Sequence, residues 1–253
     1  IISNYSCPGD KILTSDWHWS PYGTIASEIG RSVETYRMFT EDRRYDVESL
    51  WEKAEQLLAV QDRLGVIINT PAHNPTGYAL TNDDWQKVVD RLSYVAPEKR
   101  VALLIDTAYI DFAGDEEKYR EFLPVLETLP ANILPIMAYS MSKTFTIYGM
   151  RCGAAICLAP TEEIAVEFRR VCEFSSRGSW SNCAKAGQSI IANIFADEAL
   201  LEKVAKEREE IRNMLLSRGR AFEEEANRVG LPIVPFDAGF FVSIPCDNPD
   251  EIS

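Results

Sequence analysis

The segment ILPIMAYSMSKTFTIYGMRCG, residues 133–153, runs from an apolar stretch into a loop that carries two cationic side chains. Residues 133–138 are typical of a buried strand. Lys143 lies just past the end of that strand, with Ser140 three residues before it and Arg151 eight residues after it. Ligand sites in open α/β sheets lie at the carboxyl ends of the strands, so the segment predicts a binding site there.

The residue types around Lys143 point to one kind of ligand. Desolvation favours the neutral form of a lysine amine, and a neutral amine can attack an aldehyde to form a Schiff base. Ser140 and Arg151 can bind a phosphate on the same molecule, the arginine as a bidentate fork. An aldehyde and a phosphate on one small molecule describe pyridoxal phosphate (PLP). The alternative is that Lys143 is only a solvated charge in a loop.

A second segment, TPAHNPTG (70–77), follows the strand-like run 65–70. Asn-Pro favours a turn, and an X-Pro bond is the usual place for a cis peptide. Such a turn would hold the Asn74 amide rigidly at the carboxyl end of a strand. His73, beside it, is expected to pack or to support the site from behind rather than to bind a ligand. The alternative is an ordinary strand–loop–helix connection.

A third segment, VALLIDTAY (101–109), runs from five apolar residues directly into Asp106, with Tyr109 three residues further on. An isolated buried carboxylate is very costly, so a buried Asp106 needs a cationic or hydrogen-bonding partner. A protonated pyridine nitrogen is one such partner. The alternative is that Asp106 caps a following helix.

The order and spacing of these motifs resemble one enzyme family. The motifs are HNPTG at 73–77, D-x-x-Y at 106–109, S-x-S-K at 140–143 with an arginine eight residues past the lysine, and R-x-x-W-S-N at 177–182. The combination is similar to the fold-type I PLP-dependent enzymes, in particular the class I and II aminotransferases of the aspartate and aromatic group. The resemblance covers nearly all of the chain.

The resemblance implies a three-layer α/β/α fold with a mostly parallel central sheet, the large domain of a PLP-dependent transferase. It assigns residues 1–197 to that domain, and residues 198–253 to a long bridging helix and the beginning of an α+β small domain. Relatives also carry a phosphate-binding loop, a tyrosine and an α-carboxylate-binding arginine in segments that would lie outside residues 1–253. The resemblance therefore implies a large domain truncated at both ends, with weak cofactor binding and little or no turnover by itself.

The resemblance also implies roles for single residues. The catalytic set would be Lys143, which forms the Schiff base and moves the Cα proton, Asp106, which keeps the pyridine nitrogen protonated, and Tyr109. Tyr109 and Asn74 would bind the phenolic oxygen of the ring, and Ser140 and Arg151 the phosphate. The cofactor-binding set is Trp19, Asn74, Asp106, Tyr109, Ser140, Lys143 and Arg151.

The segment SDWHWSPYGT (15–24) contains two tryptophans that compete for one role. In the family an aromatic ring stacks on the cofactor, and Trp19 falls at that place, with Trp17 as its competitor. The alternative for both is core packing, which is the commoner fate of tryptophan.

Arg177, in the R-x-x-W-S-N motif, bears on the substrate. In aspartate-type relatives this arginine reaches across a dimer interface and clamps the side-chain carboxylate of the substrate. The resemblance thus implies a homodimer that moves an amino group between an amino acid (aspartate, possibly an aromatic one) and a 2-oxo acid such as 2-oxoglutarate, with ping-pong kinetics. The alternative is that Arg177 is a surface arginine.

Two other functions stay open beside transamination. One is a PLP-dependent C–S or β-lyase or a related fold-type I enzyme, which would share the lysine, the aspartate and the tyrosine. The other is a catalytically incomplete fragment that acts only as a folding or dimerisation unit.

Composition narrows the class of protein. The formal charge of −13, from 26 Lys and Arg against 39 Asp and Glu, argues against nucleic-acid partners and against an anionic membrane surface. No apolar run approaches the roughly 18 to 20 residues that a membrane helix needs. Six cysteines without close spacing suggest free thiols in a reducing compartment, and so a cytoplasmic protein. With only two histidines, no metal site is expected.

The hydrophobic pattern predicts alternating strands and helices. Strands, parallel in a βα succession, are expected at 11–14, 65–69, 101–105, 133–138 and 154–159. Helices are expected at 46–61, 81–95, 161–174 and 183–195, with Thr81 or Asn82 and then Thr161 as caps. The charged segment 114–122 is expected to be a solvated loop and a helix start.

The last part of the chain shows a different pattern. A long helix is expected over 198–228, with Leu201, Val204, Ile211, Leu215 and Phe222 on one face. Residues 231–245 are expected to begin a new β unit.

Overall fold

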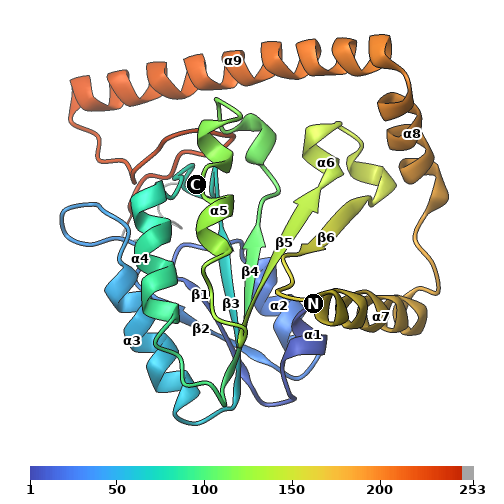
Figure 1. Cartoon of the computed structure of the whole chain (residues 1–253). Helices are drawn as coiled ribbons and strands as arrows, with labels where there is room; N and C mark the ends of the chain where they lie inside the picture. Colours follow the sequence, from blue (N-terminus) through green and yellow to red (C-terminus); the bar gives the residue numbers. More distant parts are fainter. Residues whose placement is uncertain (247–253) are drawn as a thin grey trace.

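The centre of the protein is a six-stranded sheet, seen in a computed structural model that describes residues 1–246 (Figure 1). The strand order is β2-β1-β3-β4-β5-β6. The first five are parallel to their neighbours, and β6 runs antiparallel to β5. The strands are β1 (Lys11–Ser15), β2 (Ser32–Tyr36), β3 (Arg63–Asn69), β4 (Arg100–Asp106), β5 (Ile133–Ser140) and β6 (Gly153–Cys157).

All five expected strands are present, but two features of the sheet differ from expectation. The edge strand β2 was not expected, because its sequence SVETY is half polar and only Tyr36 is fully buried. The strand β6 was expected to be parallel. The chain between β5 and β6 forms only the one-turn helix α6 (Met141–Thr144) and the 3-10 turn η3 (Tyr148–Met150), so it returns beside β5 instead of crossing over.

Helices cover both faces of the sheet, which confirms the three-layer α/β/α fold (Figure 1). Successive strand residues point to opposite faces. Leu13, Val66 and Leu103 therefore join the main core with α3 (Val47–Leu58), α4 (Asn82–Leu92) and α5 (Leu123–Leu126). Their neighbours Ile12 and Ile67 pack with α1 (Ile2–Tyr5) and α2 (Pro21–Glu28), and Ala102 packs with α7 (Glu162–Ser179).

The helix ends follow the expected capping chemistry. The Asp46 side chain accepts from Ser49 N at the start of α3, and the Thr161 side chain accepts from Ile164 N at the start of α7. Thr81, rather than Asn82, caps α4 in a reciprocal capping box with Asp84. The helices α3 and α4 lie within the ranges expected for them. Helix α8 (Lys185–Ala196) ends one residue later than expected, and α7 ends five residues later.

The helix α9 (Glu198–Val229) confirms the expected long helix and lies across the end of the sheet at which β4 and β5 point (Figure 1). Its expected apolar face is only partly covered: Ile211 and Phe222 are 36% and 40% exposed. A small residue of the helix, Gly219, lies directly against the ring of Phe236.

Residues 231–246 contain no strand, so the β unit expected there is not formed. The backbone N–H groups of Asp237 and Ala238 both donate to the Gly77 carbonyl, so they are not available to a strand partner. The segment lies on the loop between β3 and α4. The rest of the expected small domain, residues 247–253, lies outside the described residues.

The charged segment 114–122 is more ordered than expected. It contains the 3-10 turn η2 (Lys118–Arg120), and Phe122 is buried in the main core against Trp85. Within residues 1–246 no helix combines the length and apolar character needed to cross a bilayer. All six cysteines are free thiols, as expected.

Candidate active site

A cavity of about 410 Å³ opens at the carboxyl ends of β3, β4 and β5. Parallel strands place their carboxyl ends at one edge of a sheet, so side chains from distant segments meet there. Seven cofactor-binding residues were expected from the sequence, six of them after three separate strands. All seven line this cavity. The lining residues are Trp19, Asn69, Asn74, Asp106, Ala108, Tyr109, Ala138, Tyr139, Ser140, Ser142, Lys143, Tyr148, Arg151 and Phe241.

Lys143 lies in α6, the single helical turn that follows β5. Ser140 caps this turn, because its side chain accepts from Ser142 N. The Lys143 Nζ lies 4.4 Å from the ring centroid of Tyr148 and 5.9 Å from that of Tyr109. Lys143 is half-buried, and within residues 1–246 it has no carboxylate partner. Its amine therefore faces the cavity between aromatic rings.

Asp106 ends β4 and points to a tyrosine that the sequence analysis did not identify. The Tyr22 hydroxyl donates to Asp106 Oδ2 at 2.5 Å, and Ala108 N donates to Oδ1 at 3.1 Å. Burial raises the pKa of the Asp106 carboxyl, and these two hydrogen bonds oppose that rise. The 3-10 turn η1 (Ile110–Phe112) begins after Tyr109, so Asp106 is not its cap. Asp106 has the hydrogen-bonding partner that its burial requires.

Tyr109 and Asn74 lie together on the neighbouring side of the cavity. The Asn74 Nδ2 donates to the Tyr109 hydroxyl at 3.4 Å, and Asn74 N donates to Asn69 Oδ1 at 2.7 Å. The Asn69 amide in turn donates to the Asp106 carbonyl at 2.7 Å. Asn69, which the sequence analysis missed, thus links the ends of β3 and β4. Asn74 and Tyr109 both line the cavity.

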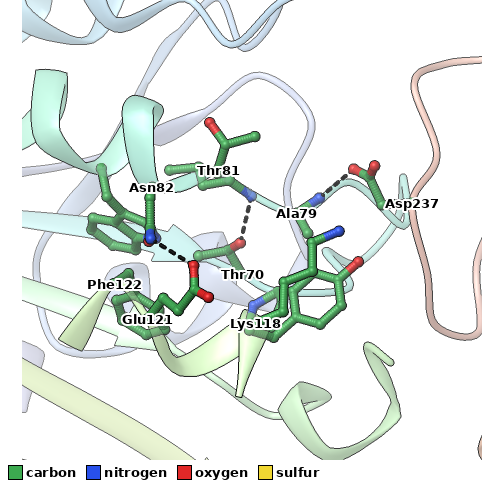
Figure 2. Close-up of a pocket in the computed structure, with 12 residues that line it drawn as sticks. Thr70, Ala79, Thr81, Asn82, Lys118, Glu121, Phe122 and Asp237 are labelled. Atoms are coloured by element: carbon green, nitrogen blue, oxygen red, sulfur yellow. Dashed lines mark hydrogen bonds between the residues drawn. The ribbon is translucent and has the colours of Figure 1, made fainter. Parts of the chain in front are cut away.

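The loop between β3 and α4, which carries Asn74, is held by further hydrogen bonds. Thr70 Oγ1 accepts from Leu80 N. The Asp237 carboxylate accepts from Ala79 N (Figure 2). These residues line a separate cavity of about 120 Å³. His73, which is 2% exposed, bonds Thr76 Oγ1 through its Nδ1, and this packing role matches its expectation. The Thr70–Pro71 and Asn74–Pro75 peptide bonds are cis.

Arg151 and two serines form the cationic end of the cavity. Arg151 Nη1 donates to the Tyr148 carbonyl at 2.8 Å and contacts Ser142 Oγ at 3.4 Å. Its guanidinium also lies 5.0 Å from the Tyr148 ring centroid, and within residues 1–246 it has no carboxylate partner. Ser142, which the sequence analysis quoted in S-x-S-K but gave no role, adds a second hydroxyl beside Ser140.

The structure separates the two competing tryptophans. Trp19 lines the cavity, is 41% exposed and packs edge-on against Tyr22 at 5.5 Å. Trp17 packs against the main core instead. Of the two tryptophans, only Trp19 lines the cavity.

Arg177 does not lie at this cavity. It is an exposed residue near the end of α7, where its Nη1 donates to Ser181 Oγ at 2.5 Å. Trp180, in the same motif, is 66% exposed. The substrate-binding role expected for Arg177 stays a prediction.

The donor set of the cavity fits PLP. An amine, Lys143, can reach an aldehyde, and Arg151 with two hydroxyls can bind a phosphate dianion. The Asp106 carboxylate also lines the cavity and can accept a hydrogen bond from a ring nitrogen. A phenol and an amide, from Tyr109 and Asn74, can bind a ring oxygen. The cavity volume of about 410 Å³ lies in the range of small-molecule sites.

Comparison with known proteins gives the same family. The family model described as aminotransferase class I and II matches residues 2–252. An aromatic-amino-acid aminotransferase of Pseudomonas aeruginosa is 30% identical over 83% of this chain and 50% of its own length. An aromatic amino acid aminotransferase of Cutibacterium acnes is 32% identical over 96% of this chain and 60% of its own. The chain therefore spans only part of the length of these relatives.

A solved structure supports the same assignment. The crystal structure of an aminotransferase from Anaerococcus prevotii superimposes with a TM-score of 0.94 at 35% identity, covering 98% of this chain and 61% of the other. The family model matches almost the whole chain, and the matched motifs meet around one cavity, so the chain belongs to the class I and II aminotransferases.

Proposed function

We propose that this protein is a PLP-dependent aminotransferase that moves an amino group between an amino acid and a 2-oxo acid. The observation that supports it most is the convergence of Lys143, Asp106 and the Asn74–Tyr109 pair on one cavity whose other end carries Arg151. These groups come from the ends of three strands, β3, β4 and β5, and each has the chemistry that one part of the cofactor requires.

The cofactor would be held by residues at three places in the cavity. Arg151, Ser140 and Ser142 would bind its phosphate, and Trp19 would pack on its ring. Asn74 and Tyr109 would hydrogen-bond its ring oxygen. Because these groups come from elements packed on the same sheet, they would orient the ring relative to Lys143 before any substrate binds.

When bound, PLP supplies an aldehyde that takes up the amino group and a ring that accepts electron density from the substrate Cα. Lys143 Nζ would bond the cofactor and could take up and release the substrate Cα proton as a general base. The Asp106 carboxylate would accept a hydrogen bond from a protonated ring nitrogen, and the hydrogen bond from the Tyr22 hydroxyl orients that carboxylate. The aromatic rings of Tyr109 and Tyr148 flank the amine.

The substrate class we propose is aspartate or an aromatic amino acid, with a 2-oxo acid such as 2-oxoglutarate as acceptor. Relatives named aromatic-amino-acid and aspartate aminotransferases support both donors. Arg177 would bind a substrate carboxylate, and its place outside its own chain's cavity requires that it act on the cavity of a second subunit. The exposed apolar residues Phe174, Trp180 and Phe195 support a homodimer.

Two further proposals concern organisation. Residues 1–197 would be the PLP-binding large domain, and residues 198–253 the bridging helix and the beginning of a small domain. The long helix α9, which begins at Glu198, supports this division. Free thiols at all six cysteines support a cytoplasmic location.

A single-turnover experiment tests the function. The protein loaded with PLP is mixed with aspartate, or with tyrosine, in the absence of any 2-oxo acid. We expect about one 2-oxo acid per site, with the nitrogen retained on the protein until an acceptor is added. Continuous release of ammonia would instead indicate a lyase. No oxo acid from any donor would contradict transamination by this chain and would favour the catalytically incomplete fragment.

A companion experiment tests Arg177. Arg177→Ala should raise the KM for aspartate more than the KM for tyrosine, because only aspartate has a side-chain carboxylate. Arg169→Ala, an exposed arginine earlier on α7, is the matched control and should change neither. Light scattering of the same samples tests the homodimer.

A further inference from the structure

Asp111 is a buried carboxylate that lies two residues beyond Tyr109, in the 3-10 turn η1. The residue is only 3% exposed. Its Oδ1 accepts from Arg120 Nη2 at 2.7 Å, and its Oδ2 accepts from the hydroxyls of Tyr139 and Thr144, each at 2.7 Å. A buried carboxylate is costly unless donors satisfy it, and these three donors do so.

The three donors come from three different elements. Arg120 lies in η2, within the charged segment after η1; Tyr139 lies on β5; Thr144 is the last residue of α6. Asp111 therefore joins the segment that follows β4 to the segment that follows β5. These two segments carry the candidate catalytic residues.

Two of the donors directly flank the residues of the site. Tyr139 precedes the capping Ser140, and Thr144 follows Lys143. The helix α6 has only four residues, and a single turn has almost no stability by itself, because nucleation of a helix is costly. Its orientation must therefore come from its anchors. Thr144 is 3% exposed, and its hydroxyl bonds Asp111.

We propose that Asp111 is a positioning residue for Lys143, acting through Thr144 and Tyr139. Asp111 does not line the cavity, so it does not touch a ligand there. It fixes the α6 turn relative to the end of β4, and so sets the distance between the Lys143 amine and the groups of Asp106 and Tyr109. The inference rests on the function proposed above, in which Lys143 bonds the cofactor.

Replacement of Thr144 tests the inference, because Thr144 lies outside the cavity lining and the exchange is nearly isosteric. Thr144→Val removes the hydroxyl but keeps the shape, and Thr144→Ser keeps the hydroxyl. Tyr139→Phe removes the second donor and serves if Thr144→Val does not fold. Tyr45→Phe is the matched control, because it removes a buried hydroxyl that bonds Tyr36 at 2.6 Å, away from the cavity.

Two readouts separate positioning from stability. One is the thermal unfolding midpoint without cofactor. The other is the lysine-dependent absorption band formed with PLP: its rate of formation, its pH midpoint and the fraction fixed by borohydride. We expect Thr144→Val to slow formation of the band about tenfold and to shift its pH midpoint. Thr144→Ser should behave like the unchanged protein, and Tyr45→Phe should lower only the unfolding midpoint.

The outcomes distinguish this inference from the function on which it rests. If the unchanged protein forms the band but Thr144→Val and Tyr139→Phe change only the unfolding midpoint, Asp111 has a purely structural role and the inference is overturned alone. If the unchanged protein forms no lysine-dependent band, the proposed function fails and this inference fails with it.

Discussion

Asp106 shows how two opposing effects set the chemistry of one side chain. Burial raises the pKa of its carboxyl, while hydrogen bonds from Tyr22 and from Ala108 N favour the ionised form. Burial and the nearby Asp106 carboxylate raise the pKa of Tyr22 well above its ordinary value, so this phenol acts as a hydrogen-bond donor. The pair is therefore suited to hold a carboxylate opposite a cationic ring nitrogen.

Tyr22→Phe should weaken this arrangement without altering its shape. Loss of the donor raises the pKa of Asp106 further, so less of the carboxylate is available to a protonated ring. A hydrogen bond to a charged group contributes about 1.5 kcal/mol or more, which corresponds to about tenfold in affinity. We expect the Kd for PLP, measured by absorbance titration at neutral pH, to rise by about that factor. Tyr36→Phe removes a buried hydroxyl outside the cavity lining and should leave the Kd unchanged. If Tyr22→Phe binds PLP as tightly as the unchanged protein, Tyr22 does not support Asp106 in this way.

His73 predicts a pH dependence of stability. Burial lowers its pKa to about 3, so the imidazole is neutral in the folded protein over a range in which the unfolded chain binds a proton. The resulting stability is fully present above about pH 6.5 and is lost as the pH falls toward 3. As the pH falls from 6 to 4, the free energy of unfolding should decrease by about 1.4 kcal/mol more per pH unit in the unchanged protein than in His73→Gln.

Urea unfolding at several pH values, without cofactor, measures this difference. The raised pKa values of Asp106 and Asp237 contribute with the opposite sign, since their stabilising effect is lost as the pH rises. Both carboxylates are present in the variant too, so the difference between the two slopes reports on His73. If the free energy of unfolding changes equally with pH in the two proteins, His73 is protonated in the folded state as well.

The sequence was sufficient to identify Lys143, Asp106 and Asn74 as candidates, because each lies at or a few residues after the end of an apolar run. It was not sufficient to find their supporting partners. Tyr22 lies 84 residues from Asp106 along the chain, and no local pattern connects them. Arg120 lies in the segment that was expected to be solvated, and no sequence pattern marked Asp111, because burial of a charged pair depends on tertiary packing.

The loop between β3 and α4 and the segment 231–246 are coupled through one glycine. Gly77 has φ +76°, and a Cβ there would clash with the Phe236 ring and with the Phe241 carbonyl oxygen. Phe241 packs edge-on against Tyr109 at 5.6 Å and lines the cavity. The contact between these two segments thus extends to the candidate site.

Gly77→Ala should therefore separate the two segments, whereas Gly230→Ala provides a matched control. Gly230 has a similar φ of +73° but open space around its Cβ position. We expect Gly230→Ala to cost about 1 kcal/mol from backbone conformation alone. Gly77→Ala should cost about 3 kcal/mol or more and should also weaken PLP binding. Urea unfolding and PLP titration of both variants test this, and similar losses in the two would mean that the packing at Gly77 contributes little.

Hydrophobic runs predicted the central strands well, since a strand covered on both faces has a continuous apolar sequence. The edge strand β2 has no such signal, because only one of its five residues is fully buried. For residues 231–245 the apolar pattern was present but misleading. The backbone groups of Asp237 and Ala238 bond the Gly77 carbonyl, and sequence gives no information about which partner a backbone group selects.

The whole molecule combines a covered sheet with large exposed apolar surfaces on the helices that follow it. Phe174 is 82% exposed on α7, Phe195 is 61% exposed on α8, and Met214 is 40% exposed on α9. These exposed side chains lie on three successive helices and would contribute to the surface of the homodimer proposed above.

An absorption spectrum with PLP tests whether Lys143 is the amine that bonds the cofactor. The protein is mixed with PLP, treated with borohydride and mapped by peptide mass, beside Lys143→Ala and Lys118→Ala. Lys118 is the matched control, because it lines the smaller cavity behind the Asn74 loop. We expect a new absorption band with PLP and, after borohydride, a covalent label on the Lys143 peptide. Both should be present in Lys118→Ala and absent in Lys143→Ala. A band that persists in Lys143→Ala, or a fixed label on another lysine, would contradict this role of Lys143.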